Sequence, residues 1–173
     1  MPAVSSTRSG RQASAAGGFT LIYMTQPATA SNCRIASTSE DIARCFPALS
    51  ELRPHLSAGT FEATIRHLMN TTNFALAYLD DGGVKAVAGY RVSEWLHAGR
   101  YLEIEDLVVA SGARSKGYGG TLFDWLVERA TIAGCRQLRL LSGVKRTDAH
   151  RFYLRKGMAI EAHYFSMNLP PRS

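Results

Sequence analysis

A glycine-rich segment holds the residue types most suited to binding a phosphate. It runs from Arg114 to Thr121 and has the sequence RSKGYGGT. It lies between an apolar run that predicts a strand and an amphipathic stretch that predicts a helix. A glycine-rich turn before a helix exposes several backbone amides, and the helix dipole adds positive potential there. Arg114 and Lys116 add charge, so the segment predicts a site for a phosphate-bearing ligand.

Two common phosphate-binding motifs fit this segment poorly. A P-loop needs a lysine between its last glycine and a Ser or Thr, but here Gly120 is followed directly by Thr121. A dinucleotide-binding fingerprint needs a third glycine where Leu122 stands. It also needs an acidic residue at the end of the next strand, which here ends in Leu-Leu-Ser. A glycine-rich turn without any ligand is the remaining alternative.

Two charge clusters accompany the segment. The first is acidic and comprises Glu94, Glu103, Glu105 and Asp106. Glu103 and Glu105 are two residues apart on an expected strand and share a face, whereas Asp106 is expected to point the other way. This cluster favours a cationic acceptor. The second is basic and comprises Arg136, Arg139, Lys145, Arg146, Arg151, Arg155 and Lys156, with Asp148 as the one acid among them. It is either a solvated face or a surface that attracts a polyanion.

The elements that must position these residues follow from apolar periodicity and from helix breakers. Strands are expected at 33–37, 73–78, 84–92, 101–109, 137–141, 159–162 and 164–169. Helices are expected from Thr38 or Ser39 to 49, over 60–69, from the glycine-rich loop to 133, and over 147–156. Pro47 and Pro54 are expected to kink or end the first helix. This order predicts a mixed sheet with helices on its faces.

The composition is that of one globular domain. The chain has 173 residues, of which 46% are hydrophobic and 20% charged, with a net charge of +6. No run of about 18 apolar residues occurs, so no membrane span is expected. Three scattered cysteines without metal-ligand spacing argue against a disulfide framework and a metal site. They favour a reduced protein, and we expect a cytoplasmic one.

Residues 1–31 differ from the rest of the chain. They are rich in Ser, Ala, Thr and Gly and have no helical or strand periodicity, so we predict a disordered extension before a domain at 32–173. The apolar run 19–24 is too short for a secretory signal. An alternative is that translation starts at Met24.

Two motifs together resemble those of the GNAT superfamily of acetyl-CoA-dependent N-acetyltransferases. The first is an Arg-x-x-Gly-x-Gly motif that starts at Arg114, and the second is an Ala-x-x-Phe-Tyr motif that ends at Tyr153 and is followed by Gly157. The resemblance covers about 33–169. It implies an α/β (α+β) fold with three layers, in which a mixed, mostly antiparallel sheet of about six to seven strands is flanked by about four helices.

The resemblance also implies roles for particular residues. A strand end would pair with the pantetheine arm, and the loop amides would hold the pyrophosphate beside Arg114. The cofactor-binding residues would be Leu107, Val108, Val109, Arg114, Ser115, Lys116, Gly117, Tyr118, Gly119 and Gly120. Tyr153 would protonate the leaving thiolate, and Glu103 occupies the place of the general base in one branch of the family. Other branches use water chains, and Arg146 stands where many members have Asn.

The implied function is direct transfer of an acetyl group from acetyl-CoA to a primary amine of a small molecule. Alternatives are an acetyltransferase acting on a protein or on aminoacyl-tRNA, which the basic stretch motivates, and a non-catalytic acyl-CoA-binding module. For the first hypothesis we expect no membrane or nucleic-acid partner, and a homodimer is common in the family. The acceptor would lie between the N-terminal helices and the final strands, which carry Arg53, His55, His67, Tyr164 and Phe165 and indicate no unique ligand.

Overall fold

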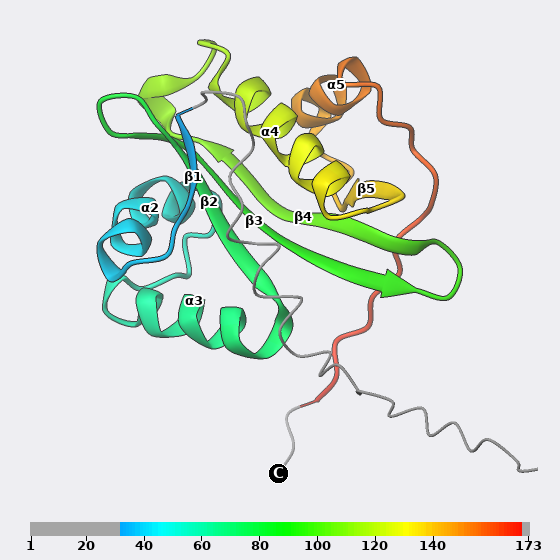
Figure 1. The fold of residues 1–173 in the computed structure, drawn as a ribbon, viewed down its shortest axis with the longest axis horizontal. Coiled ribbons are helices and arrows are strands. Elements are labelled where there is room, and N and C mark those ends of the chain that lie inside the picture. The colour runs from blue at the N-terminus through cyan, green and yellow to red at the C-terminus, as the bar shows by residue number, and fades with distance from the viewer. Residues whose placement is uncertain (1–31, 171–173) are drawn as a thin grey trace, which may run out of the picture.

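A mixed five-stranded sheet forms the central layer (Figure 1). The computed structural model describes residues 32–170, so the predicted extension 1–31 and the alternative start at Met24 lie outside the described residues. Neighbouring strands are antiparallel except for the last pair, which is parallel. Across the sheet, as along the chain, the strands are β1 (Cys33–Ile35), β2 (Phe74–Asp80), β3 (Val84–Trp95), β4 (Gly99–Val109) and β5 (Gln137–Leu140).

Helices cover both faces of this sheet (Figure 1). One face carries α2 (Ser39–Leu52) and α3 (Ala58–Thr72), and the other carries α4 (Tyr118–Ile132) and α5 (Thr147–Arg155). A short 3-10 turn, η1 (Ser111–Ala113), leads from β4 toward α4. The predicted three layers and four helices are confirmed. Among the described helices, none is long and apolar enough to cross a bilayer.

The start of α2 follows the sequence closely, and its end does not. The Thr38 hydroxyl accepts the amide of Asp41 (3.1 Å), and the Asp41 carboxylate accepts the amide of Thr38 (3.1 Å). This reciprocal pair forms a capping box. The helix then continues through Pro47 and ends at Leu52, beyond the predicted end. Its last turn therefore brings further side chains toward the end of β4.

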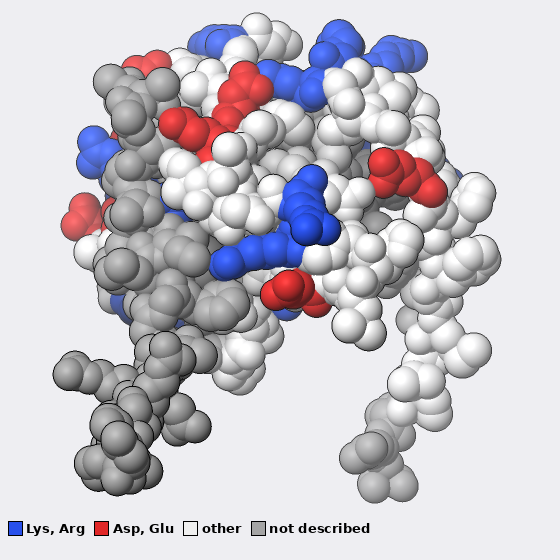
Figure 2. All heavy atoms as spheres, turned by 45° about the vertical axis from the view of Figure 1, so that its right-hand side comes forward, with Lys and Arg blue, Asp and Glu red and all other residues white. Residues whose placement is uncertain are grey.

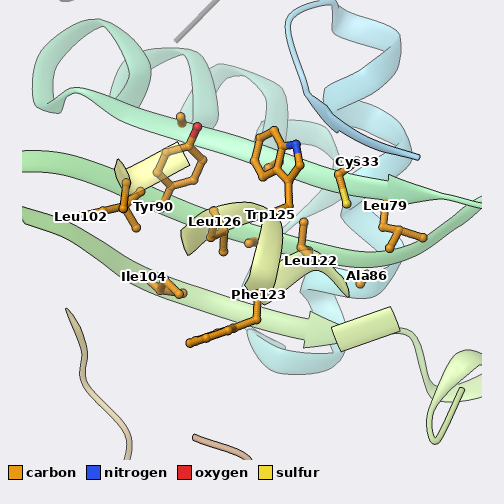
Figure 3. Packing of buried hydrophobic residues seen from close by; sticks show 14 of the residues in the cluster. Cys33, Leu79, Ala86, Tyr90, Leu102, Ile104, Leu122, Phe123, Trp125 and Leu126 are labelled. Carbon is orange, nitrogen blue, oxygen red and sulfur yellow. The ribbon is translucent and has the colours of Figure 1, made fainter. Parts of the chain in front are cut away.

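The core between the sheet and α4 sets the position of the glycine-rich loop. Leu122 and Leu126 are fully buried, and α4 packs through them against the sheet (Figure 3). The same cluster includes Phe123 and Trp125 of α4 together with Cys33, Leu79, Ala86, Tyr90, Leu102 and Ile104 of the strands. Because α4 starts directly after the loop, this packing holds the loop at the end of β4.

An irregularity in β4 changes which side chains face the α2–α3 layer. Gly89 of β3 lies opposite Asp106, and Tyr90 lies opposite Ile104, so Glu105 is an extra residue on β4. Such a bulge breaks the alternation of faces along a strand. The prediction that Asp106 points away from Glu105 is therefore wrong, because both residues line one cavity on the α2–α3 side. A glycine inside a strand is a known signal of a bulge, and Gly89 provides that signal here.

The last two predicted strands do not form. The described residues after α5 contain no strand, so the predictions at 159–162 and 164–169 are wrong and the sheet has five strands rather than six to seven. The alternation of Phe165, Met167 and Leu169 is typical of a half-buried strand. In the structure these side chains are 81–89% exposed. Alternation predicts a strand only where a partner backbone accepts its hydrogen bonds, and here none is in place.

Replacing Gly89 with alanine should destabilise the protein by about 1–3 kcal/mol. A Cβ at this position would meet the Phe74 ring at 2.7–2.8 Å and the Asp106 carboxylate at 3.4 Å. Phe74 is buried in the core under α2 and α3, so its ring has little room to move. The free energy of unfolding in urea measures the effect. The control is Gly59→Ala near the start of α3, where the new methyl would make only an ordinary contact with the Ser57 hydroxyl (3.9 Å) and stability should hold or rise. A Gly89→Ala protein as stable as the wild type would contradict the tight packing.

Candidate functional site

The start of α4 has the features of an anion-binding position. Gly117 precedes the helix with a φ of +86°, and Ser115 has a φ of +61°. In the described chain, no side chain caps this helix start. The first amides of α4 therefore point out of the helix with the positive end of its dipole, as phosphate binding requires. The amide of Thr121 is the first to bond within the helix, to the carbonyl of Gly117 (3.0 Å).

Two of the glycines allow neighbouring elements to approach this helix start closely. A Cβ on Gly119 would lie 3.0 Å from the Val109 side chain, and one on Gly120 would lie 3.5 Å from the Lys156 ammonium. Glycine at position 119 thus lets the helix start lie against the end of β4, whereas Gly120 makes an ordinary contact with Lys156. The same positions keep the backbone accessible to a ligand.

Side chains from distant elements hold the loop in place. Glu51 at the end of α2 accepts the amide of Ser111 (3.0 Å) and pairs with Arg114 (3.2 Å). On the other side, the Tyr118 hydroxyl donates to Asp81 (2.5 Å), and this bond raises the pKa of Tyr118, as does partial burial. Sequence reasoning missed Glu51, because no local pattern links residues 60 positions apart. The Arg114 side chain is thus directed to α2, while its backbone starts the loop.

The last residues of β4 have an open edge. The parallel pairing of β4 with β5 ends at Ile104 opposite Leu140, whereas β4 continues to Val109. The amide of Ala110 donates to Lys85 of β3 (2.9 Å). Backbone groups of successive strand residues point to opposite sides, so the amides of Val109 and Leu107 face the open side.

The three predicted residues at this strand end differ in orientation. Val108 is buried under the α2–α3 layer, and its backbone faces β3. Leu107 and Val109 instead pack partly against the α4 layer. Only these two residues therefore offer backbone groups to an extended ligand beside β4.

Tyr153 lies on α5 and packs beside α4. Its ring centroid is 5.3 Å from that of Phe152 and 6.4 Å from that of Phe123 of α4. Burial raises the pKa of Tyr153 above its ordinary value of 10, although the charge of Arg146 acts in the opposite direction. The phenol is therefore protonated at neutral pH and can donate a proton.

A hydrogen bond joins the two predicted motifs. The Lys156 ammonium at the end of α5 donates to the carbonyl of Gly120 (3.3 Å) and pairs with Asp124 of α4 (2.7 Å). The helix that carries Tyr153 is thereby fixed to the helix that starts at the glycine-rich loop. Residues far apart in the sequence thus form one site.

Glu103 is held by a stacked arginine. Its carboxylate pairs with Arg139 of β5 (3.0 Å). The Arg139 guanidinium lies 3.6 Å from the ring centroids of both Trp95 and Tyr101. Such cation–π contacts restrict the arginine and hence its partner. Glu103 does not belong to the cavity lining described next, which instead includes its neighbour Glu105.

A cavity of about 200 Å³ opens between α2, α3 and β4. Its polar lining combines Arg53 and His55, which follow α2, with Glu105 and Asp106 of the β4 bulge. The rest of the lining is Leu49, Leu56, Phe61, Thr64, Ile65, Leu68 and Phe74. Of the residues predicted to bind an acceptor, the structure therefore brings Arg53 and His55 together, whereas the lining does not include His67, Tyr164 or Phe165.

The basic stretch 136–156 does not form a uniform basic surface. Arg139, Arg151 and Lys156 are each paired with an acidic residue. On the face shown in Figure 2, the Lys and Arg side chains of the described residues are interspersed with Asp and Glu. This arrangement favours a solvated face over a nucleic-acid surface. Within residues 32–170, no group of three or more His, Cys, Asp or Glu side chains could hold a metal ion.

Taken together, these features suit transfer chemistry on a phosphate-bearing ligand. The helix start would bind its phosphates, and the open edge of β4 would pair with an extended arm. Tyr153 supplies a proton donor, and the carboxylates of the cavity supply proton acceptors. A second, smaller ligand would reach the strand from the α2–α3 side.

Comparisons with known proteins agree with this arrangement. Residues 35–158 match the model of the acetyltransferase (GNAT) family. An uncharacterized N-acetyltransferase, YhdJ, of Bacillus subtilis (strain 168) is 35% identical over 131 residues, covering 75% of this chain and 92% of that protein. The aminoalkylphosphonate N-acetyltransferase of Salmonella typhimurium is 38% identical over 80 residues, covering 46% of this chain and 52% of that enzyme.

Solved structures share the fold. A putative acetyltransferase from Agrobacterium tumefaciens superposes with a TM-score of 0.69 at 23% identity, covering 79% of this chain and 99% of that chain. An aminoglycoside N-acetyltransferase in complex with CoA superposes with a TM-score of 0.67 at 13% identity, covering 83% of this chain and 98% of that chain.

Proposed function

This chain belongs to the acetyltransferase (GNAT) family, and we propose that it transfers the acetyl group of acetyl-CoA directly to the primary amine of a small molecule. The observation that carries the proposal is the packing of Tyr153 against Phe123 of α4, the helix whose uncapped start follows the open end of β4. A proton donor is thus held by the same helix whose start suits a phosphate-bearing thioester.

The loop and the strand end fit acetyl-CoA. The amides from Ser115 to Gly120 would hold the pyrophosphate, with the charge of Lys116 beside them. Leu107 and Val109 would pair with the pantetheine arm, and the amide of Val109 would donate to the carbonyl oxygen of the acetyl group. When bound, acetyl-CoA supplies a thioester carbon that an amine can attack. Arg114 would act mainly by fixing the loop through Glu51.

The residues around this position would move two protons. The acceptor amine must be neutral when it attacks, so a carboxylate of β4 takes its proton. A bond between nitrogen and the acetyl carbon then forms as the carbon–sulfur bond breaks. The Tyr153 hydroxyl gives its proton to the sulfur. The new amide nitrogen then loses its second proton to the tyrosinate, and the carboxylate releases the first proton to solvent, so protons and charge balance.

Two carboxylates are candidates for the base. Glu103 was the prediction from the sequence, and it is engaged by Arg139 outside the cavity lining. Glu105 pairs with Arg91 and lines the cavity. We therefore propose Glu105 as the group that takes the proton, with Glu103 as the second candidate.

The size of the cavity supports a small acceptor. A cavity of about 200 Å³ suits an amine of few heavy atoms better than a bulky acceptor. The name of the Salmonella relative supports the same class of acceptor. The paired charges of the basic stretch give less support to aminoacyl-tRNA. A cytoplasmic location and a homodimer stay predictions.

Acetyl-CoA should raise the Tm of the protein. A ligand that binds only the native state stabilises it by about 2.7 kcal/mol at a concentration of 100 times Kd. Lys116→Ala should weaken binding about 3- to 10-fold, because it removes one positive charge from an exposed phosphate site. Thermal shift titrations with acetyl-CoA measure both the rise in Tm and the loss of affinity in Lys116→Ala. The control is Arg34→Ala, an exposed residue of β1 at the other edge of the sheet. A wild-type Tm that does not change on addition of acetyl-CoA would refute the proposed function.

Tyr153→Phe should lower kcat about 100-fold or more, because general acid catalysis is typically worth that much. The ring and its contacts with Phe123 and Phe152 remain, so acetyl-CoA should still raise Tm as in the wild type. Because burial raises the pKa of Tyr153, its proton donation should fail only as the pH rises above 10. Release of free thiol from acetyl-CoA, with a panel of primary amines, measures the rate. Tyr78→Phe removes a hydroxyl on the opposite face of the sheet and serves as the control. Equal values of kcat for Tyr153→Phe and the wild type would exclude Tyr153 as the proton donor.

Glu105→Gln should reduce kcat more than Glu103→Gln does. Of these two carboxylates, only Glu105 lines the cavity, so only its substitution removes a group that an acceptor amine reaches directly. The same thiol-release assay, run from pH 6 to 9, compares the two variants. The opposite ranking would return the role of base to Glu103.

A further inference from the structure

The charges that line the acceptor cavity are balanced rather than acidic. Asp106 pairs directly with Arg53, another residue of the cavity lining (2.8 Å), and Glu105 pairs with Arg91 of β3. Each carboxylate of the β4 bulge thus already faces a guanidinium. The acidic cluster seen in the sequence therefore does not act as a net negative site. A simple cationic amine would meet both attraction and repulsion there.

The guanidinium of Arg53 has further hydrogen-bond donors at the mouth of the cavity. Its side chain is 47% exposed, whereas that of Asp106 is 15% exposed, so the guanidinium lies nearer the surface and the carboxylate lies deeper. The bond to Asp106 uses Nε. An arginine has five donors, and its two terminal amino groups suit an anion in a bidentate arrangement.

His55 adds a second donor beside Arg53. Both residues follow α2 directly, and both line the cavity. The same lining includes Glu105 and the less exposed Asp106, on the strand whose end is proposed to hold the acetyl group. The cavity thus has groups suited to an anion at its mouth and carboxylates at its inner end.

From this order of charges, we infer that the acceptor is a small amine that also carries an anionic group, such as a carboxylate or a phosphonate. The anion binds Arg53 and His55, and the ammonium faces Glu105 and Asp106 before it loses its proton. Arg53 is then the residue that determines specificity. This inference rests on the proposed function and names the substrate class of the same site.

Three amine acceptors and two variants of Arg53 distinguish an effect of the acceptor's charge from an effect of its shape. The acceptors are 3-aminopropanoate and its nearly isosteric amide, 3-aminopropanamide, which has the same amine without the anionic group. A third acceptor, 2-aminoethylphosphonate, carries a different anionic group. With acetyl-CoA present, kcat/KM for at least one anionic amine should exceed that for the amide at least tenfold. Arg53→Gln should reduce this ratio at least tenfold, and Arg53→Lys should restore part of it. Equal kcat/KM values for all three amines, or an unchanged ratio in Arg53→Gln, would overturn the inference.

Arg66→Gln is the matched control. Arg66 of α3 is similarly exposed (43%) and similarly paired, with Glu62 at 2.8 Å, but it does not belong to the cavity lining. Its substitution should leave the ratio unchanged. Direct binding of the amines, measured by calorimetry without acetyl-CoA, separates the two proposals. Anion-selective binding that needs Arg53 but leads to no transfer would support the inference and refute the proposed function. Transfer to 3-aminopropanamide as fast as to the anions would refute the inference alone.

Discussion

The short parallel pairing of β4 with β5 is the constraint on which the rest of the site depends. It joins Tyr101–Ile104 to Gln137–Leu140 and then stops, while β4 continues to Val109. Two parallel strands need a crossover connection, and α4 provides it. The crossover starts where β4 ends, so an uncapped helix start lies beside a strand edge with free backbone groups. A phosphate site and a site for an extended arm follow from this one arrangement.

The second decisive feature is the β4 bulge opposite Gly89. One extra residue turns Glu105 and Asp106 to the same side of the sheet, below the connection between α2 and α3. The donor side and the acceptor side of the site thus come from one strand. Its final residues face the open edge, and its bulge faces the cavity. A direct transfer between two ligands is consistent with such a strand, because both can reach it without moving.

Long-range ion pairs then convert a cluster of acids into a set of balanced charges. Glu103, Glu105 and Asp106 pair with Arg139, Arg91 and Arg53, which come from three different parts of the chain. The pairs of Glu103 and Glu105 are partly buried on both sides, and in the third pair Asp106 is more buried than Arg53. Their effect here is on selectivity, because each one changes what a charged acceptor meets.

The sequence by itself determined the features that are local. A helix cap at Thr38 or Ser39, the glycine-rich helix start, the motif around Tyr153 and a mixed sheet with helices on its faces were predictable, because each depends on neighbours within a few residues or on periodicity. Only the tertiary structure decided the rest. Glu51 meets Arg114, and Arg53 meets Asp106, across more than 50 residues of chain, and the bulge turns Asp106 toward Glu105. The strands predicted at 159–162 and 164–169 did not form, although Phe165, Met167 and Leu169 alternate with polar residues as in a half-buried strand. Strand pairing and ion pairing require a partner in space, and no spacing along the chain specifies where that partner lies.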